Sequence, residues 1–159
     1  MFMFVGVCDK FLSHEDETKE FARFLGQVLN AGDVLLLKGD IGAGKSFFAR
    51  SLIQSLQDTP EDVPSPTFTL VQTYQTRIGE VWHSDLYRLQ SIYEVEELGL
   101  WEAFESAICL VEWPELIMHE APETALLLDF QPHETQTGRS VGISACTQSW
   151  AARLKGLVC

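Results

Sequence analysis

Basic residues are scarce in this sequence: it has 11 Lys and Arg against 23 Asp and Glu among 159 residues, a formal net charge of −12. A surface this acidic repels phosphate backbones, so extensive direct binding of nucleic acid is not expected. An anion that binds this chain therefore needs a locally positive pocket, and each Lys or Arg near that pocket matters.

The four cysteines form no recognisable framework, because the sequence has no Cys-x-x-Cys pair and no cluster of Cys with His. Two of them, Cys109 and Cys146, lie in apolar runs and are predicted to be small core residues. We interpret this pattern, which also includes Cys8 and Cys159, as typical of a reducing cytoplasm.

Long apolar runs are also absent. Residues 1–8 are apolar, but they are too short to span a bilayer and lack the basic start of a signal peptide. We therefore expect a strand there and no membrane association. The sequence has no repeat, low-complexity tract or domain linker, and 46% of its residues are hydrophobic. These observations predict a single domain over residues 1–159.

The clearest feature that is present is Gly39-Asp40-Ile41-Gly42-Ala43-Gly44-Lys45-Ser46, which matches the phosphate-binding pattern G-x-x-x-x-G-K-[ST]. Its glycines allow backbone N–H groups to curl around an anion. Lys45 adds charge for the outer phosphates, and we expect it to face solvent when no ligand is bound. The Ser46 hydroxyl is a ligand for Mg²⁺. The alternative is a glycine-rich turn that precedes Lys-Ser by chance.

The surroundings of this loop favour the phosphate-binding interpretation. Residues 33–38 form a short apolar run that is typical of a buried strand. After the loop, apolar residues recur at helical spacing to about Gln57, so the loop opens a helix whose N-terminal dipole favours phosphate.

The other expected elements describe an α/β protein. We predict a three-layer, P-loop NTPase-like fold with a mostly parallel sheet and an inserted antiparallel hairpin. The hairpin comprises strands 67–76 and 80–86 around a turn at 77–79. A helix capped by Ser13 and Asp16 precedes the loop and ends near 30–32. The remaining elements are a short helix broken by Gly99 within 92–104, a buried strand at 107–111, a helical segment at 113–119, strands at 125–130 and 140–146, and a closing helix over 150–157.

Two carboxylates lie at predicted strand ends. Glu112 ends an apolar strand, the usual layout for a carboxylate on the metal side of a nucleotide site. The alternative is a solvated glutamate that starts the next helix. Asp85, within His83-Ser84-Asp85-Leu86-Tyr87-Arg88, is a candidate for holding metal-bound water, or part of a structural network. Thr67 is a candidate sensor of a γ-phosphate, or simply the entry to an edge strand.

Other features bear on the nucleotide and the reaction. The sequence lacks the Asn/Thr-Lys-x-Asp segment that recognises guanine, which favours ATP over GTP. It also lacks the clustered arginines with which a kinase covers two substrates, so an ATPase is favoured over a small-molecule kinase. A nucleotide-dependent binding module with little turnover stays an alternative. Arg88 is the nearest candidate for an arginine finger, although a structural role fits it equally well.

Four segments, at 39–46, 65–71, 83–89 and 111–115, occur in an order and spacing that resemble the bacterial TsaE (YjeE) family. This family is the ATPase of tRNA threonylcarbamoyladenosine synthesis. The resemblance implies a compact P-loop α/β fold and weak ATP hydrolysis with Mg²⁺ by the isolated subunit. It also implies two partner proteins, a TsaD-like transferase and a TsaB-like companion, and contact with tRNA only through their complex. The expected location is the cytoplasm.

The resemblance also implies roles for single residues. Glu112 resembles the family's metal-side glutamate, Asp85 its catalytic or coupling aspartate, and Trp113 the tryptophan beside the glutamate. The catalytic set is then Lys45, Asp85 and Glu112, with Ser46 and Glu112 on the metal. The nucleotide-binding set is Gly39, Asp40, Gly42, Ala43, Gly44, Lys45, Ser46, Phe47, Thr67 and Arg139. Ser46 replaces the family's usual Thr, and residues 131–138 match the family poorly.

Overall fold

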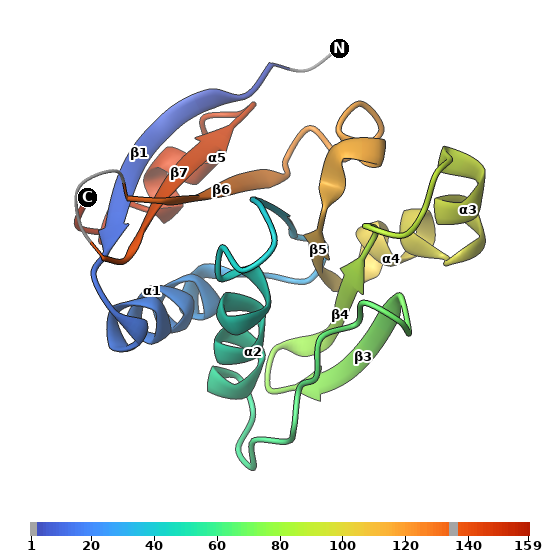
Figure 1. Cartoon of the computed structure of the whole chain (residues 1–159), viewed down its shortest axis with the longest axis horizontal. Helices are drawn as coiled ribbons and strands as arrows, with labels where there is room; N and C mark the ends of the chain where they lie inside the picture. The colour runs from blue at the N-terminus through green and yellow to red at the C-terminus, as the bar shows by residue number, and fades with distance from the viewer. Residues whose placement is uncertain (1–2, 134–136) are drawn as a thin grey trace.

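The computed structural model describes residues 3–133 and 137–159 (Figure 1). Within them, seven strands form one sheet in the order β1-β7-β6-β2-β5-β4-β3. The strands are β1 (Val5–Leu12), β2 (Val34–Lys38), β3 (Val71–Thr76), β4 (Gly79–Asp85), β5 (Ile108–Glu112), β6 (Leu126–Pro132) and β7 (Arg139–Ala145). The helices are α1 (Glu15–Val28), α2 (Lys45–Ser55), α3 (Ile92–Glu97), α4 (Leu100–Ser106), the 3₁₀ helix η1 (Pro114–Ile117) and α5 (Ser149–Arg153).

The centre of the sheet is parallel and both of its edges are antiparallel. Strands β6, β2, β5 and β4 run parallel, whereas β3 pairs antiparallel with β4, and β7 pairs antiparallel with β6 and β1. The α/β class and the predicted hairpin are confirmed. The prediction of a mostly parallel sheet holds for the four central strands but not for the edges. The short connection between β6 and β7 permits only an antiparallel pairing of these two strands.

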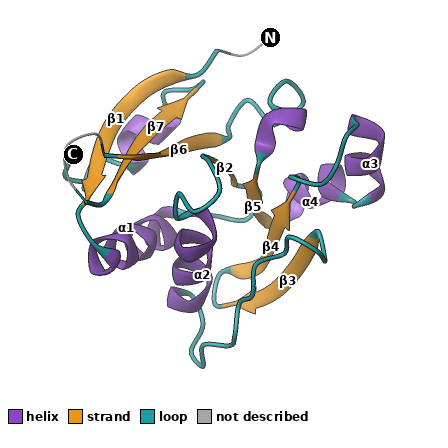
Figure 2. Ribbon diagram, viewed as in Figure 1, coloured by secondary structure: helices purple, strands orange, loops and turns teal. Residues whose placement is uncertain are grey.

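Helices cover both faces of the sheet (Figures 1 and 2). On one face, α1 and α2 pack into a core that includes Phe21, Leu25 and Phe48. On the other face, α3, α4 and η1 pack into a second core. Strands β2 and β5 are buried between these layers, which explains their continuous apolar sequences. The parallel centre therefore presents the C-terminal ends of β2, β5 and β4 at one edge.

Several element boundaries differ from the sequence prediction. Strand β3 begins at Val71 and not at Thr67, because residues 66–69 form a turn in which the Leu70 N–H donates to the Pro66 carbonyl over 2.7 Å. The predicted helix at 113–119 is only the short η1. The capping box at Ser13 is wrong: His14 is the N-cap, and the Ser13 N–H donates to the Glu17 carboxylate over 2.6 Å. The acidic residue that accepts the hydrogen bond from Ser13 is therefore four residues further along the chain, and not three.

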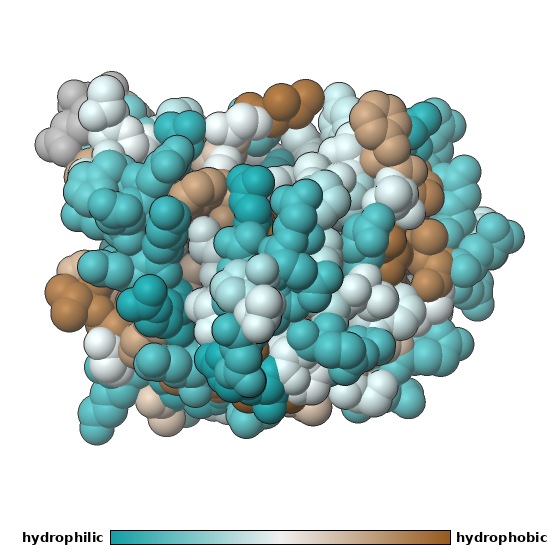
Figure 3. Space-filling view, turned by 90° about the horizontal axis from the view of Figure 1, so that it is seen from below, coloured by the Kyte–Doolittle hydropathy of each residue, from teal (hydrophilic) through white to brown (hydrophobic). Residues whose placement is uncertain are grey.

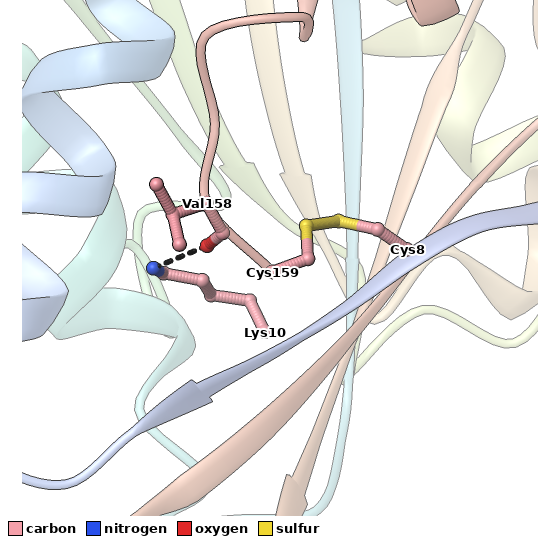
Figure 4. Close-up of a disulfide and its surroundings, with 4 residues drawn as sticks. All are labelled: Cys8, Lys10, Val158 and Cys159. Carbon is pink, nitrogen blue, oxygen red and sulfur yellow. Dashed lines mark hydrogen bonds between the residues drawn. A yellow bond between two sulfur atoms is a disulfide. The ribbon is translucent and has the colours of Figure 1, made fainter.

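The C-terminal residues are tied to the middle of β1. Cys8 forms a disulfide with Cys159, and the Lys10 ammonium donates to the Val158 carbonyl over 2.6 Å (Figure 4). Nothing in the cysteine spacing predicted this pairing across 151 residues. Because stable disulfides are rare in reducing compartments, the pairing argues against our interpretation of the cysteine pattern, and a cytoplasmic location stays a prediction.

The two remaining cysteines behave differently from each other. Cys109 is buried in β5, as predicted, and burial raises the pKa of its thiol to about 12. Cys146 is only half-buried, so its assignment to the core is wrong. It follows the last residue of β7 directly and so lies outside the sheet.

The surface of the molecule is largely hydrophilic on the face shown in Figure 3, with a few separate apolar patches. None of the helices formed by residues 3–133 and 137–159 combines the length and the apolar character that crossing a membrane requires.

Candidate functional site

The glycine-rich loop joins β2 to α2 at the C-terminal edge of the sheet. Gly39, Gly42 and Gly44 have φ angles of 146°, 80° and 105°, which side chains rarely tolerate. At Gly39 a Cβ would also lie 2.6 Å from the Phe130 carbonyl oxygen. The loop therefore requires glycine to fold back onto the N-terminus of α2. There the first N–H groups of the helix have no partner within the helix, which favours an anion.

Lys45 lies inside the site and not in solvent. Its side chain is buried, at 4% exposure, and its ammonium donates to the Gly39 carbonyl. The same nitrogen lies 3.5 Å from the centre of the Trp113 ring. Burial lowers the pKa of Lys45, and the nearby Glu112 and Asp85 carboxylates oppose that shift. The expectation of a solvent-facing lysine is wrong, because Trp113 supplies a cation–π contact that the linear sequence does not show.

The Ser46 side chain, at the start of α2, contacts the Glu112 carboxylate at the end of β5. The Ser46 Oγ lies 2.8 Å and 2.9 Å from the two carboxylate oxygens of Glu112. The Oε2 atom of Glu112 also lies 2.6 Å from Nε2 of His83 on β4. Glu112 is buried at the end of β5, so it is not a solvated residue of the following helix.

Asp85 lies beside Glu112, because the register of β4 and β5 pairs these two residues directly. One oxygen of Asp85 accepts from the Tyr87 N–H over 2.9 Å, and the other accepts from the Thr67 hydroxyl over 3.2 Å. Burial is the main cause that raises the pKa of Asp85, and the charge of Glu112 raises it further. The site thus holds two carboxylates that repel each other.

These groups surround a cleft of about 410 Å³. Its lining comes from the glycine-rich loop, the start of α2, the segment before β3 and the ends of β4 and β5. The lining residues are Ile41, Gly42, Ala43, Gly44, Lys45, Ser46, Phe47, Ser65, Thr67, Asp85, Tyr87, Glu112 and Trp113. The structure therefore brings most of the predicted site residues to one place.

A second cleft of about 260 Å³ lies on the other side of the loop and shares Ala43, Gly44 and Phe47 with the first. Arg139 lines this second cleft. Its guanidinium donates to the Ala43 carbonyl over 2.9 Å and to the Gly42 carbonyl over 3.0 Å. Arg139 thus ties the carbonyl groups of the loop to the start of β7.

Three predicted residues lie apart from the clefts. Gly39 and Asp40 line neither of them and instead shape the start of the loop, where the Asp40 carbonyl accepts from the Ala43 N–H. Arg88, the candidate arginine finger, lies 5.1 Å from the centre of the exposed Phe68 ring and lines neither cleft. The structure therefore gives no support to Arg88 as an arginine finger.

Sequence reasoning missed three lining residues of the larger cleft: Ile41 of the glycine-rich loop, Ser65 and Tyr87. The Ser65 hydroxyl lies 2.9 Å from the Thr67 hydroxyl and 3.5 Å from that of Ser46, so it links the loop to the Asp85 network. The Tyr87 ring packs against Trp113 with 4.6 Å between ring centres. All three residues lie within the quoted sequence segments, but none has a spacing signal of its own. Sequence reasoning also did not identify Leu12, His14 and Thr18, which line the second cleft. At these positions the sequence indicated only the approach to a helix and its first turns.

The fold and the site together define a mixed α/β protein in which a glycine-rich loop joins a central parallel strand to a helix, with carboxylates at the ends of the next two strands. A family model described as threonylcarbamoyl adenosine biosynthesis protein TsaE matches residues 12–141. The chain belongs to the TsaE family, as the motifs predicted.

Individual relatives agree with this assignment. The tRNA threonylcarbamoyladenosine biosynthesis protein TsaE of Rickettsia felis is 46% identical over 108 residues, which are 68% of this chain and 63% of that protein. The aligned part thus spans less than two thirds of the R. felis protein. The protein of the same name from Bacillus subtilis is 40% identical over 112 residues, 70% of this chain and 69% of that protein. The crystal structure of B. subtilis YdiB is similar, with a TM-score of 0.79 and 26% identity over 98% of this chain and 95% of that one.

We expect Asp85→Asn to stabilise the ligand-free protein. The raised pKa of Asp85 means that the folded protein binds this proton more tightly than the unfolded chain does. The stabilising contribution is complete below the usual pKa of 3.8 and is lost as the pH rises through the folded value, so the ionised side chain costs stability at pH 7. The amide can keep the contacts to Tyr87 and Thr67. A gain of about 1 kcal/mol would raise the Tm by about 2–4 °C.

Thermal unfolding of both proteins between pH 7 and pH 4 measures this effect. The difference in Tm should shrink as the pH falls, because Asp85 of the original protein then becomes protonated. Asp62→Asn, at an exposed position, is the control and should change the Tm little. A lower Tm for Asp85→Asn at pH 7 would contradict the expectation.

Proposed function

We propose that this chain binds and hydrolyses ATP with Mg²⁺ and thereby supports tRNA N6-threonylcarbamoyladenosine modification by a TsaB–TsaD-like complex. The observation that carries the proposal is the convergence of Lys45, Ser46, Asp85 and Glu112 on one cleft at a helix N-terminus. Membership of the TsaE family supports the process. The activity and the partners are inferences from these two findings.

The larger cleft suits a polyphosphate. The first residues of α2 line it, at the end of the helix where N–H groups without a helical partner favour an anion. Arg139, which lines the second cleft, holds the Ala43 and Gly42 carbonyl oxygens. Lys45 supplies positive charge once it leaves Trp113. Among the described residues, Lys45 is the only Lys or Arg that lines this cleft, so the phosphates need a metal ion as well.

The oxygen donors of the site fit Mg²⁺, which is bound in proteins by one or two side-chain oxygens together with phosphate oxygens and water. Ser46 and Glu112 would hold the ion, since their oxygens already lie within 2.9 Å of each other. Bound Mg²⁺ supplies a positive charge that stabilises the negative charge developing on the transferred phosphate. The chain itself positions the phosphates and orients the attacking water, for which Asp85 is the residue in place.

The nucleoside would occupy the second cleft. This cleft opens next to the loop, shares Gly44 and Phe47 with the phosphate cleft, and has the apolar wall of Leu12 and Phe130 that a flat base requires. The polar side chains of His14 and Thr18 at the same wall are candidates for contacts to the edge of the base. ATP is proposed over GTP only on the missing guanine motif.

The isolated chain is expected to turn over slowly, because no arginine among the described residues reaches the larger cleft. The test measures phosphate release from ATP by the purified chain, alone and with the TsaB–TsaD-like pair. We expect stimulation of about tenfold or more. Equal rates with and without the pair would contradict the dependence on partners, and phosphate recovered on a second small molecule would instead favour a kinase.

Trp113 is expected to matter for this stimulation more than for nucleotide binding. It has a strained φ of 56°, covers Lys45 and packs on the half-exposed Tyr87, so it connects the phosphate site to the surface. Removing the ring frees Lys45 from a contact of about 0.5–2 kcal/mol, so Trp113→Ala should bind nucleotide as well as before or up to several-fold better. Stimulation by partners should fall.

Calorimetry with a non-hydrolysable ATP analogue and the stimulated ATPase assay separate these two effects. Trp113→Phe keeps an aromatic face over Lys45 and is the matched control, for which we expect most of the stimulation to be retained. If Trp113→Ala is stable and is stimulated normally, the proposed connection is wrong. If it mainly loses thermal stability, the ring is only a packing residue.

A further inference from the structure

His83 is a buried histidine beside the site that no part of the proposed mechanism uses so far. Its side chain is 0% exposed, and its Nε2 lies 2.6 Å from Oε2 of Glu112. Because side chains alternate along a strand, His83 and Asp85 project from the same face of β4. The register pairs Asp85 with Glu112, so the imidazole lies behind the glutamate, one step further from the cleft.

The direction of this hydrogen bond follows from its partners. An ionised carboxylate can only accept, so the Nε2 atom of His83 carries the proton and donates it. The other ring nitrogen, Nδ1, is buried and has no hydrogen-bond partner among the described residues. The contact with Glu112 is therefore the one polar interaction that the described structure provides for a fully buried imidazole. An apolar side chain would fill the same space without leaving Nδ1 unpaired.

The two oxygens of Glu112 have different surroundings. Oε2 is shared by His83 and Ser46, whereas the hydrogen bond to Oε1 comes from Ser46 alone. His83 belongs to the sheet, while Ser46 belongs to the first turn after the glycine-rich loop. Asp85, the register partner of Glu112, repels its carboxylate. Without the donor behind it, the Glu112 carboxylate would keep only the contact to Ser46 among the hydrogen bonds of the described structure, and the repulsion by Asp85 would favour its rotation away from Asp85.

We propose that His83 is a positioning residue that holds Oε2 of Glu112 from behind and so presents Oε1 to the metal that accompanies the nucleotide. The inference rests on the proposed function, because it concerns the Mg²⁺-dependent part of nucleotide binding. It assigns His83 no contact with nucleotide or metal. Groups that orient a metal ligand in this way typically change metal affinity by about 10- to 100-fold when they are removed.

The experiment compares the affinity for a non-hydrolysable ATP analogue with Mg²⁺ and with EDTA, measured by calorimetry on the full chain. The quantity of interest is the gain in affinity that Mg²⁺ provides. His83→Leu removes the donor and keeps the bulk. We expect it to bind the analogue in EDTA about as tightly as the original protein does, and to lose about 10- to 100-fold of the Mg²⁺ gain.

His83→Gln is the rescue variant, because its amide carries an N–H donor at about the reach of Nε2. We expect its Mg²⁺ gain to lie close to that of the original protein. His83→Asn carries the donor nearer the backbone, where it does not reach Glu112, and should behave like His83→Leu. It also serves as the test if His83→Leu does not fold. Val81→Ala, on the same buried face of β4, is the control for loss of packing and should lower the Tm with the Mg²⁺ gain intact.

Each outcome is decisive. An undiminished Mg²⁺ gain in His83→Leu, or a loss of affinity that is equal in Mg²⁺ and in EDTA, would overturn the positioning role. An equal loss of the Mg²⁺ gain in Val81→Ala would also overturn it. If the original protein binds the analogue neither in Mg²⁺ nor in EDTA, the proposed function itself is contradicted. This result is distinguishable from failure of the positioning role, which requires that the original protein binds.

Discussion

Lys45→Ala should weaken binding of ATP with Mg²⁺ by about 100-fold or more while the protein still folds. The bound lysine would donate charge-assisted hydrogen bonds to the outer phosphates, each worth about 1.5–3 kcal/mol, and each 1.4 kcal/mol corresponds to tenfold in affinity. In the ligand-free state the same ammonium is buried, and it contacts the Gly39 carbonyl and the Trp113 ring. Its removal therefore relieves a desolvation cost, and the Tm should stay within about 4 °C of the original value.

Calorimetry and thermal unfolding on the same samples measure both effects. Lys38→Ala, at the exposed end of β2, is the matched control, because it removes one positive charge close in sequence without reaching either cleft. We expect Lys38→Ala to bind nucleotide within a few-fold of the original protein. Unchanged affinity in a folded Lys45→Ala variant would exclude the glycine-rich loop from nucleotide binding.

Glu112→Gln should impair hydrolysis much more than it impairs nucleotide binding. The amide keeps the size of the side chain and one acceptor oxygen for the Ser46 hydroxyl, but it loses the charge that serves the metal and the attacking water. Removing one group that stabilises a transition state typically costs about 100- to 1,000-fold in turnover. We expect a loss of that size in the presence of the partner proteins, with the affinity for the analogue in Mg²⁺ reduced less, by about 10- to 100-fold.

Multiple-turnover phosphate release and calorimetry with the non-hydrolysable analogue measure the two quantities. Glu115→Gln is the matched control, because Glu115 is exposed on η1, three residues further along the chain, and lines neither cleft. It should turn over normally. If Glu112→Gln also turns over normally in the full complex, Glu112 has only a structural role in the buried network with Ser46 and His83.

Much of the fold and of the site could be predicted from local patterns. The loop at 39–46 is contiguous, so its glycines, lysine and serine are recognisable without any tertiary information. Strands such as β2 and β5 are continuous apolar runs, because parallel strands are buried on both faces. The meeting of the carboxylates at the ends of β4 and β5 follows from the parallel pairing of these strands, since parallel strands end at one edge of a sheet. The limits of the capping box and of β3 were missed by a few residues, because turns depend on single hydrogen bonds.

The sequence by itself determined the phosphate-binding pattern, the α/β class, the hairpin and the TsaE family, because each depends on residues that are close together or on the order of several motifs. Only the tertiary structure decided that Lys45 is covered by Trp113, and that Arg139 reaches the loop across 96 residues. It also decided that Glu112 is shared by Ser46 and His83, and that Cys8 meets Cys159. These are single contacts between segments far apart in the chain. They have no period or spacing along the sequence, so they arise only when the strands are ordered in space.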